Sequence, residues 1–276
     1  MKTSRKARNV TIAAVAAVAA VGIVGVNSAQ AEPKHPAPSA KPTIVLEHGA
    51  WADASSWNGV VKRLSHDGYD VVAAPNPLRG LPQDVASLRG LLSTIKGPVI
   101  LAGHSYGGDV ITEAATGNKN VKGLVYIAGF APDAGESISS LLEKPLTHPT
   151  PPLPVVPVAI TNPDGTQSTE IYLDRKGFRA AFAGDVPKGT ADLMAATQRA
   201  TDASALTGKI STPAWRSIPS WYLVGTQDQA IAPELQRFMA KRMHATTVEI
   251  KASHASLVSH PSAVTDLIER AARTVR

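Results

Sequence analysis

The hexapeptide GHSYGG at residues 103–108 decides the fold class that we expect for this 276-residue chain. It follows the apolar run VILA at residues 99–102, and the small residues after it predict a helix to about Ala115. A G-x-S-x-G sequence between a strand and a helix is typical of a nucleophile elbow, a strained turn that lifts a serine hydroxyl above the edge of a sheet. Glycine is needed two residues before and after the serine, because side chains there would collide with the neighbouring strand and helix. We therefore predict that Ser105 is a nucleophile.

On both sides of this turn, short apolar runs alternate with amphipathic stretches. The apolar runs predict strands at residues 43–49, 69–75, 98–105, 121–130, 220–225 and 246–250. Apolar residues at helical spacing predict helices at residues 55–68, 81–95 and 233–243, and from Pro261 onward. Nearly continuous apolar strands that alternate with helices are typical of a mostly parallel sheet covered on both faces. The sequence thus predicts an α/β fold.

Residues 133–218 interrupt this alternation. They include seven prolines between Pro145 and Pro163, and only weak helical patterns at residues 178–183 and 191–200. An insertion of about 85 residues is too long for a plain loop. We expect it to form a cap over the carboxyl edge of the sheet, where open α/β folds bind their ligands.

A serine hydroxyl needs a base to remove its proton, and eight histidines are candidates. His254 follows the strand at 246–250 by a short loop, so it should emerge at the sheet edge that carries Ser105. His260 directly precedes Pro261 and is interpreted as the residue that begins the last helix. His104 is expected to point to the opposite side of the chain from Ser105. We predict that His254 is the base.

The base needs an orienting acid, and in a strand–turn–helix site of this kind the order along the chain is serine, acid, histidine. Asp228 lies three residues beyond the strand at 220–225 and 26 residues before His254. Asp133 follows the strand at 121–130 and is the alternative acid. Asp228 is favoured as the orienting acid, and Asp133 remains the alternative.

An oxyanion hole needs two N–H groups that point at one position. The residue after the nucleophile, Tyr106, supplies one backbone N–H, and the loop after the first strand should supply the other. We choose Ala50, because Gly49 should permit the sharp turn that aims its N–H. Trp51, Phe130 and Trp215 are candidate residues of the substrate pocket.

The first 31 residues have the pattern of a secretory signal. Four basic residues lie within residues 1–9, residues 10–26 are uncharged and apolar, and Ala29 and Ala31 form an A-x-A cleavage site. We expect cleavage after Ala31, an exposed proline-rich linker at 32–42 and a single domain over 43–276. A retained anchor is the alternative, but 17 apolar residues are short for a span of about 20. The mature protein is expected to be secreted, without stable membrane association.

Charge and composition exclude several function classes. The chain has 28 Lys and Arg against 22 Asp and Glu, but four of the basic residues belong to the predicted signal. The remaining charges form no basic run, so nucleic acid is not an expected partner. The chain has no cysteine, and neither metal-binding nor nucleotide-binding motifs occur, so we expect no metal and no cofactor. A small-molecule ester is the expected partner.

Four segments together resemble the α/β-hydrolase superfamily, namely HGAWADASSW (48–57), GHSYGG (103–108), GTQDQAI (225–231) and SHASLVSHP (253–261). They are most similar to its esterase and hydroxynitrile-lyase branch with a small cap. The resemblance implies Ser105, Asp228 and His254 as a catalytic triad, with Ala50 and Tyr106 as oxyanion donors. Plant hydroxynitrile lyases that resemble this chain have a lysine directly after the catalytic histidine, whereas this chain has Ala255.

These observations predict a secreted serine hydrolase that cleaves carboxylic esters through an acyl-enzyme on Ser105. Serine at the elbow disfavours the epoxide hydrolases and haloalkane dehalogenases of this fold, which use aspartate. The alternatives are other chemistry on the same fold, namely a hydroxynitrile lyase, an amidase or a perhydrolase. A non-catalytic ligand-binding protein is a further alternative.

Overall fold

The computed structural model describes residues 41–274, so the predicted signal (1–31) and all but the last two residues of the predicted linker lie outside the described residues. The main sheet has six strands in the order β2-β1-β3-β4-β8-β9, and all neighbouring pairs are parallel. Its strands are β1 (Thr43–Glu47), β2 (Val71–Ala74), β3 (Val99–His104), β4 (Val121–Ile127), β8 (Ser220–Gly225) and β9 (Thr246–Ile250). The predicted α/β fold class is confirmed, and each predicted strand is present.

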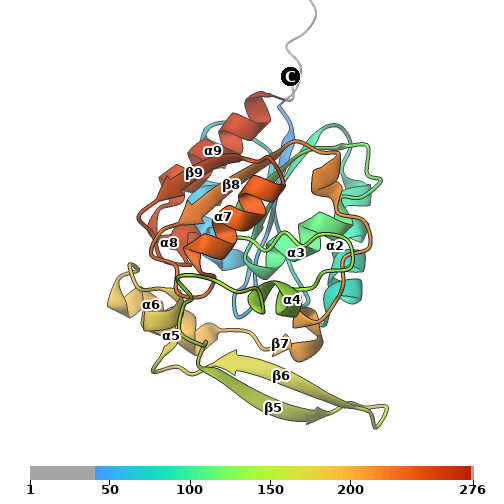
Figure 1. Cartoon of the computed structure of the whole chain (residues 1–276). Helices are drawn as coiled ribbons and strands as arrows, with labels where there is room; N and C mark the ends of the chain where they lie inside the picture. The colour runs from blue at the N-terminus through green and yellow to red at the C-terminus, as the bar shows by residue number, and fades with distance from the viewer. Residues whose placement is uncertain (1–40, 275–276) are drawn as a thin grey trace, which may run out of the picture. The chain divides into compact units, whose positions relative to one another are not determined.

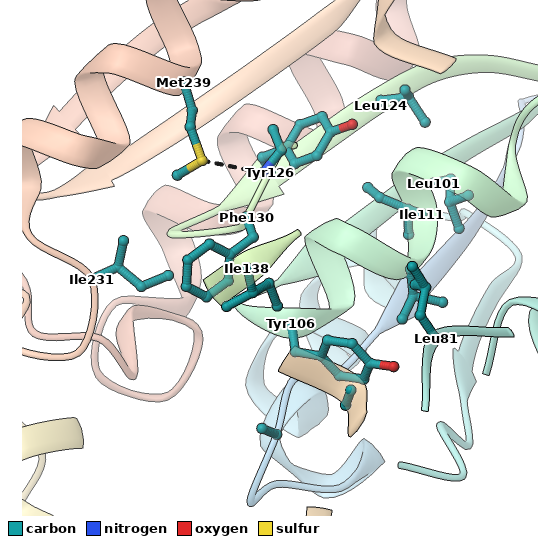
Figure 2. Packing of buried hydrophobic residues seen from close by; sticks show 14 of the residues in the cluster. Leu81, Leu101, Tyr106, Ile111, Leu124, Tyr126, Phe130, Ile138, Ile231 and Met239 are labelled. Atoms are coloured by element: carbon teal, nitrogen blue, oxygen red, sulfur yellow. Dashed lines mark hydrogen bonds between the residues drawn. The ribbon is translucent and has the colours of Figure 1, made fainter. Parts of the chain in front are cut away.

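Helices cover both faces of the main sheet (Figure 1). One face packs against α2 (Leu81–Thr94), α3 (Tyr106–Ala114) and α7 (Pro233–Arg242). The other face packs against α1 (Asn58–His66) and α9 (Pro261–Arg273), with the short helices η1 (Ala54–Trp57) and α8 (Ser256–Ser259) beside them. Successive side chains of a strand point to opposite faces, so Leu101 joins the first core while its neighbours Ile100 and Ala102 join the second. Figure 2 shows the first core, where Met239 of α7 accepts a hydrogen bond from the backbone N–H of Ala131.

The strand order reverses between β1 and β3. From β1 the chain passes outward to β2, and then returns to form β3 on the other side of β1. The connections that follow β1 and β3 therefore leave in opposite directions and open a crevice at the carboxyl ends of these two strands. Ala50 follows β1 and Ser105 follows β3, so the topology brings two of the predicted site residues to this crevice.

The segment between β4 and β8 forms a cap with a small sheet of its own, which Figure 1 shows on the side of the molecule away from the C-terminal end of α9. This antiparallel sheet has the order β5-β6-β7. Its strands are β5 (Val155–Thr161), β6 (Gln167–Leu173) and β7 (Thr201–Asp202), and the helices of the segment are α4 (Ile138–Leu142), α5 (Phe178–Phe182), α6 (Lys188–Thr197), η2 (Ala203–Leu206) and η3 (Ala214–Arg216).

The cap departs from the sequence expectation in one respect. The sequence predicts helices near residues 178–183 and 191–200, and α5 and α6 lie there. It predicts no strand in the proline-rich part of this segment, whereas β5 and β6 pair there as a hairpin. A turn at residues 162–165, with Gly165 at φ 83°, joins the two strands. The sequence Asn-Pro-Asp-Gly at these positions is a turn signal that could have indicated the hairpin.

Within residues 41–274, no helix is long and apolar enough to cross a membrane.

Candidate active site

Ser105 occupies a strained turn between β3 and α3. Its backbone has φ 53° and ψ −124°, a conformation that costs a non-glycine residue about 1–3 kcal/mol. The surrounding chain holds this conformation, because the carbonyl of Ser105 accepts hydrogen bonds from the N–H groups of Gly108 (2.9 Å) and Phe130 (3.0 Å). Only 5% of Ser105 is exposed. This geometry is that of a nucleophile elbow.

The glycines on both sides of the turn have a steric reason. A Cβ atom at Gly103 would lie 2.5 Å from the carbonyl oxygen of Gly107, and one at Gly107 would lie 2.5 Å from the carbonyl oxygen of Glu47. Backbone atoms at these distances cannot move aside cheaply. The expected need for glycine two residues before and after Ser105 is therefore confirmed.

His254 and Asp228 form a buried pair at the same edge of the sheet. Nδ1 of His254 lies 2.7 Å from Oδ2 of Asp228, and the two residues are 1% and 0% exposed. An ionised carboxylate only accepts hydrogen bonds, so Nδ1 is the donor and Nε2 is left for another partner. Ser105 and His254 line one cavity.

The other predicted acid, Asp133, does not contact His254. Its carboxylate forms an ion pair with Arg216 at 2.6 Å and accepts a hydrogen bond from the N–H of Ala134. Partial burial raises the pKa of this carboxyl, but the hydrogen bond and the charge of Arg216 outweigh it and hold the pKa below its usual value. Of the two candidate acids, the structure brings only Asp228 to His254.

Two other histidines, His260 and His104, lie near the ends of the segment that carries His254 or in contact with it. His260 is the N-cap residue directly before α9, at the helix start where the sequence places it. The Nε2 of His104 donates to the carbonyl oxygen of His254 at 2.9 Å, and its ring lies 4.7 Å from the imidazole of His254, contacts that the sequence does not indicate. Burial, with the nearby His254, lowers the pKa of His104 well below its usual value. His104 therefore holds the backbone of His254 as a neutral side chain.

The predicted oxyanion donors, Ala50 and Tyr106, both line the cavity that contains Ser105. The prediction that Gly49 makes the sharp turn of this loop is wrong, because the residue in the left-handed region is Trp51, with φ 57°. A Cβ atom at Gly49 would lie 2.7 Å from Cβ of Ser105. Glycine is thus needed here for close approach of the loop to Ser105.

His48 fixes the loop that carries Ala50. Its Nδ1 lies 2.9 Å from the carbonyl oxygen of Gly49, and its Nε2 accepts from the N–H of Asn76 at 3.1 Å. Nδ1 must therefore carry the proton. Burial is the main cause that lowers the pKa of His48 to about 4, so the ring is neutral at neutral pH.

The phenol of Tyr106 is anchored as well. Its hydroxyl donates to Oδ2 of Asp84 at 2.6 Å, and Asp84 is fully buried. Burial raises the pKa of Asp84, although hydrogen bonds from the N–H groups of Arg79 and Gly80 and from Tyr106 oppose this rise. The residue after Ser105 is thus held through both its backbone and its side chain.

A cavity of about 340 Å³ lies between the elbow and the cap. Besides Ser105 and His254, most of its lining residues are apolar, and they come from the body and from the cap segment at residues 138–155. Figure 2 shows three of them, with Ile231 next to Phe130, and Ile138 between Phe130 and Tyr106 in this view. No Asp, Glu, Lys or Arg within residues 41–274 is among the lining residues. The cavity therefore favours an uncharged, apolar molecule.

Two of the three predicted pocket residues, Trp51 and Phe130, line this cavity. The prediction for Trp215 is wrong, because its indole Nε1 donates to the carbonyl oxygen of Pro132 at 3.0 Å. The guanidinium of Arg242 lies 5.6 Å from the centre of its ring. Trp215 thus packs between the end of α7 and the chain after β4, outside the cavity.

The cap contacts the loop of His254, which the sequence did not indicate. The ring of Phe182 lies edge-on to the imidazole of His254, at 4.7 Å between centres, and its carbonyl oxygen accepts from the N–H of Ala255 at 3.0 Å. Asp185 accepts hydrogen bonds from the hydroxyls of Ser253 and Ser259, the latter at 2.9 Å. The end of α5 is therefore tied to the segment that carries the candidate base.

The described residues 41–274 contain no group of three or more His, Asp or Glu side chains placed to hold a metal ion. The polar groups of the cavity can attack a carbonyl carbon, move a proton and bind an oxyanion.

Comparison with known proteins identifies the family. Residues 44–267 match the model of the Alpha/beta hydrolase family, and the chain belongs to that family. The family match identifies it as a hydrolase.

The chain is 28% identical over 253 residues to the alpha/beta hydrolase nvfD of Aspergillus novofumigatus (strain IBT 16806). The alignment covers 84% of this chain and 97% of that protein. It is 32% identical over 116 residues to a carbendazim hydrolyzing esterase of Nocardioides sp. (strain SG-4G). This alignment covers 37% of this chain and 48% of the esterase. The solved structure of polyneuridine aldehyde esterase matches with a TM-score of 0.72 at 20% identity, over 84% of this chain and 99% of that one. At such identity, the structural likeness shows the fold alone.

Proposed function

We propose that this protein is a serine carboxylesterase with Ser105, His254 and Asp228 as its catalytic triad. The single observation that carries the proposal is the buried contact of 2.7 Å between His254 and Asp228, beside a cavity that also contains the strained Ser105. The partial similarity to an esterase that hydrolyses carbendazim supports the same chemistry.

In the first half of the reaction, Oγ of Ser105 attacks the ester carbonyl carbon while Nε2 of His254 takes the hydroxyl proton. Asp228 stabilises the imidazolium that forms and keeps Nδ1 as the donor. The oxygen that becomes negative is bound by the backbone N–H groups of Ala50 and Tyr106. When the tetrahedral intermediate collapses, the ester C–O bond breaks and His254 gives its proton to the leaving alcohol.

In the second half, a water molecule attacks the acyl-enzyme. His254 takes a proton from this water and the oxyanion forms again at the same two N–H groups. Collapse releases the carboxylic acid, and the proton returns to Oγ of Ser105. The cycle consumes one ester and one water, and needs no metal or cofactor.

The substrate class follows from the lining of the cavity. Transfer of a charged group into an apolar site is costly when no countercharge receives it. We therefore propose neutral esters with apolar acyl groups, of a size that a cavity of about 340 Å³ admits.

Two p-nitrophenyl esters of similar length test this function, the neutral butyrate and the anionic 3-sulfopropionate, with the wild type and Ser105→Ala. The proposal predicts turnover of the butyrate by the wild type, much weaker turnover of the anionic ester, and loss of both enzymatic activities in Ser105→Ala. Equal rates for the wild type and Ser105→Ala would contradict it.

We also propose secretion with cleavage after Ala31, on the pattern of residues 1–31. Mass spectrometry of the protein from the culture medium tests it, with a mature chain that begins at Glu32 as the expected result. Recovery of the chain only in the membrane fraction, with residues 1–31 intact, would contradict it.

A further inference from the structure

Gln236 lies on α7 with its side chain fully buried next to the candidate acid. Its Nε2 donates to Oδ2 of Asp228 at 2.8 Å, the same oxygen that receives Nδ1 of His254. We propose that Gln236 is a positioning residue of the active site, which fixes the Asp228 carboxylate and through it the tautomer and orientation of His254. The inference rests on the proposed triad.

The orientation of the Gln236 amide is determined by its partners. Nε2 contacts two groups that only accept, Oδ2 of Asp228 and the carbonyl oxygen of Ile231, each at 2.8 Å. Oε1 faces a group that only donates, the N–H of Gly225, at 3.2 Å. A flipped amide would place oxygen against oxygen and N–H against N–H. The amide therefore has a single arrangement, in which it presents a donor to Asp228.

This donor completes the environment of the carboxylate. Oδ1 of Asp228 accepts from the N–H groups of Ala230 (2.7 Å) and Ile231 (2.9 Å), and Oδ2 accepts from Gln236 and His254. All four groups around the two oxygens are donors, so each fits an ionised carboxylate. Without Gln236, Oδ2 would be held only by the imidazole that it has to orient.

Gln236 also connects the acid to the sheet. Its contact with Gly225 reaches the last residue of β8, and its contact with Ile231 closes the loop that carries Asp228. The N–H of Asp228 also bonds the carbonyl oxygen of Gly225, at 3.2 Å, so the backbone places Asp228 near the strand and the buried amide places its Oδ2. A role of this kind predicts effects on the rate of the chemical steps and on their pH dependence.

The test uses two variants and a control. Gln236→Met keeps the volume and removes every hydrogen bond of the amide, while Gln236→Glu keeps the shape and replaces the donor with a carboxyl group. Gln198→Met is the matched control, because the Gln198 amide makes three hydrogen bonds to the backbone of Leu173 and Ala195, which do not line the cavity.

We expect kcat for p-nitrophenyl butyrate to fall about 10- to 100-fold in both Gln236 variants, with KM little changed. A carboxylate that loses a donor attracts the imidazolium proton more strongly, so the midpoint of the acidic limb of kcat/KM should move to higher pH. The hydrogen-bonded Nδ1 proton of His254, observed by ¹H NMR, should shift or broaden. Gln198→Met should show none of these changes. Gln236 variants that fold and keep the wild-type kcat, acidic limb and Nδ1 proton signal would overturn the inference.

The two proposals fail in different ways. If the wild type shows no turnover that depends on Ser105, the proposed esterase function is wrong. The NMR signal of the Nδ1 proton still tests Gln236 in that case, because it reports the contact between Asp228 and His254 in the absence of substrate. An unchanged signal in folded Gln236→Met would overturn the positioning role by itself.

Discussion

The side chains of the central strands β3 and β8 are buried on both faces of the sheet, whereas those of the cap strand β5 are almost all exposed. The body surrounds its strands with helices, and so fixes Ser105, Asp228 and His254 at the ends of three strands. The cap is joined to this edge by buried side chains such as Phe182, and by individual hydrogen bonds such as those of Trp51 and Asp185. The body therefore positions the proposed catalytic groups, while the cap lines part of the cavity and holds the loop of the candidate base.

The largest effect is expected from the acid in the body, compared with the acid that lies where the cap segment begins. Asp228→Asn should lower kcat about 10³- to 10⁴-fold. The neutral amide can donate to Nδ1 of His254, which favours the tautomer with the proton on Nε2, and it does not stabilise the positive charge of the imidazolium. Asp133→Asn should change kcat by less than about threefold, since it removes a partly exposed ion pair with Arg216 that does not contact His254. Steady-state kinetics on p-nitrophenyl butyrate decides. A larger loss of kcat in Asp133→Asn than in Asp228→Asn would make Asp133 the acid.

The second effect concerns the packing of the body. Gly107→Ala should destabilise the protein by about 3 kcal/mol or more, because its Cβ would meet the backbone of Glu47 at 2.5 Å. Gly90→Ala, on the open surface of α2, has no atom within 4 Å of the new Cβ and should stabilise by about 0.5–1 kcal/mol. Urea denaturation measures both. Similar stabilities for the two variants would contradict this account of the elbow.

A smaller effect is expected where the body meets the cap. The indole Nε1 of Trp51 donates to the carbonyl oxygen of Ile171 in β6 at 3.0 Å. Trp51→Phe removes this bond and keeps an aromatic ring in the cavity, so kcat/KM should fall about three- to tenfold, mainly through KM. The matched control is Trp57→Phe, because the Nε1 of buried Trp57 has no hydrogen-bond partner in the described part of the chain. An equal decrease of kcat/KM in Trp57→Phe would contradict a specific effect of the bond between Trp51 and Ile171.

The smallest effect is a pH dependence of the link between the cap and the loop of His254. Partial burial raises the pKa of Asp185, but hydrogen bonds from Ser253 and Ser259 outweigh this effect and lower the pKa. A lowered native pKa means that the stabilisation is complete above the ordinary pKa of an aspartate, about 3.9, and is lost as the pH falls through the native value.

Asp185→Asn should therefore lower Tm by about 2 °C at pH 7, and by progressively less as the pH falls below about 4. Thermal unfolding of both proteins from pH 7 to pH 3 measures the difference. A difference that grows toward low pH would contradict the assigned sign.

The sequence predicted those features that follow from local periodicity and from chain order. The strands of the main sheet are short apolar runs, and Ser105, Asp228 and His254 each follow one of these runs, so their edge of the sheet could be inferred. Features that depend on contacts between distant segments could not. The bond of His104 to the carbonyl oxygen of His254 spans 150 residues, and the indole of Trp215 reaches Pro132 across 83.

Gln236 shows the same limit within a helix. Its position in α7 is that of an ordinary buried residue, and only the return of this helix to the end of β8 brings its amide to Asp228. For Gly49, the sequence indicated the right residue for the wrong reason. Trp51 is the residue with a left-handed backbone conformation. Glycine is required at position 49 because a larger residue there would collide with Ser105.

The most direct test of the central claim is covalent trapping by a fluorophosphonate, whose phosphorus is attacked by an activated serine. We predict that mass spectrometry after proteolysis finds one modified residue, Ser105, that His254→Ala abolishes the modification, and that p-nitrophenyl butyrate slows it by competition. No modification of Ser105 in the folded wild type, or modification that persists at the wild-type rate in His254→Ala, would contradict the account.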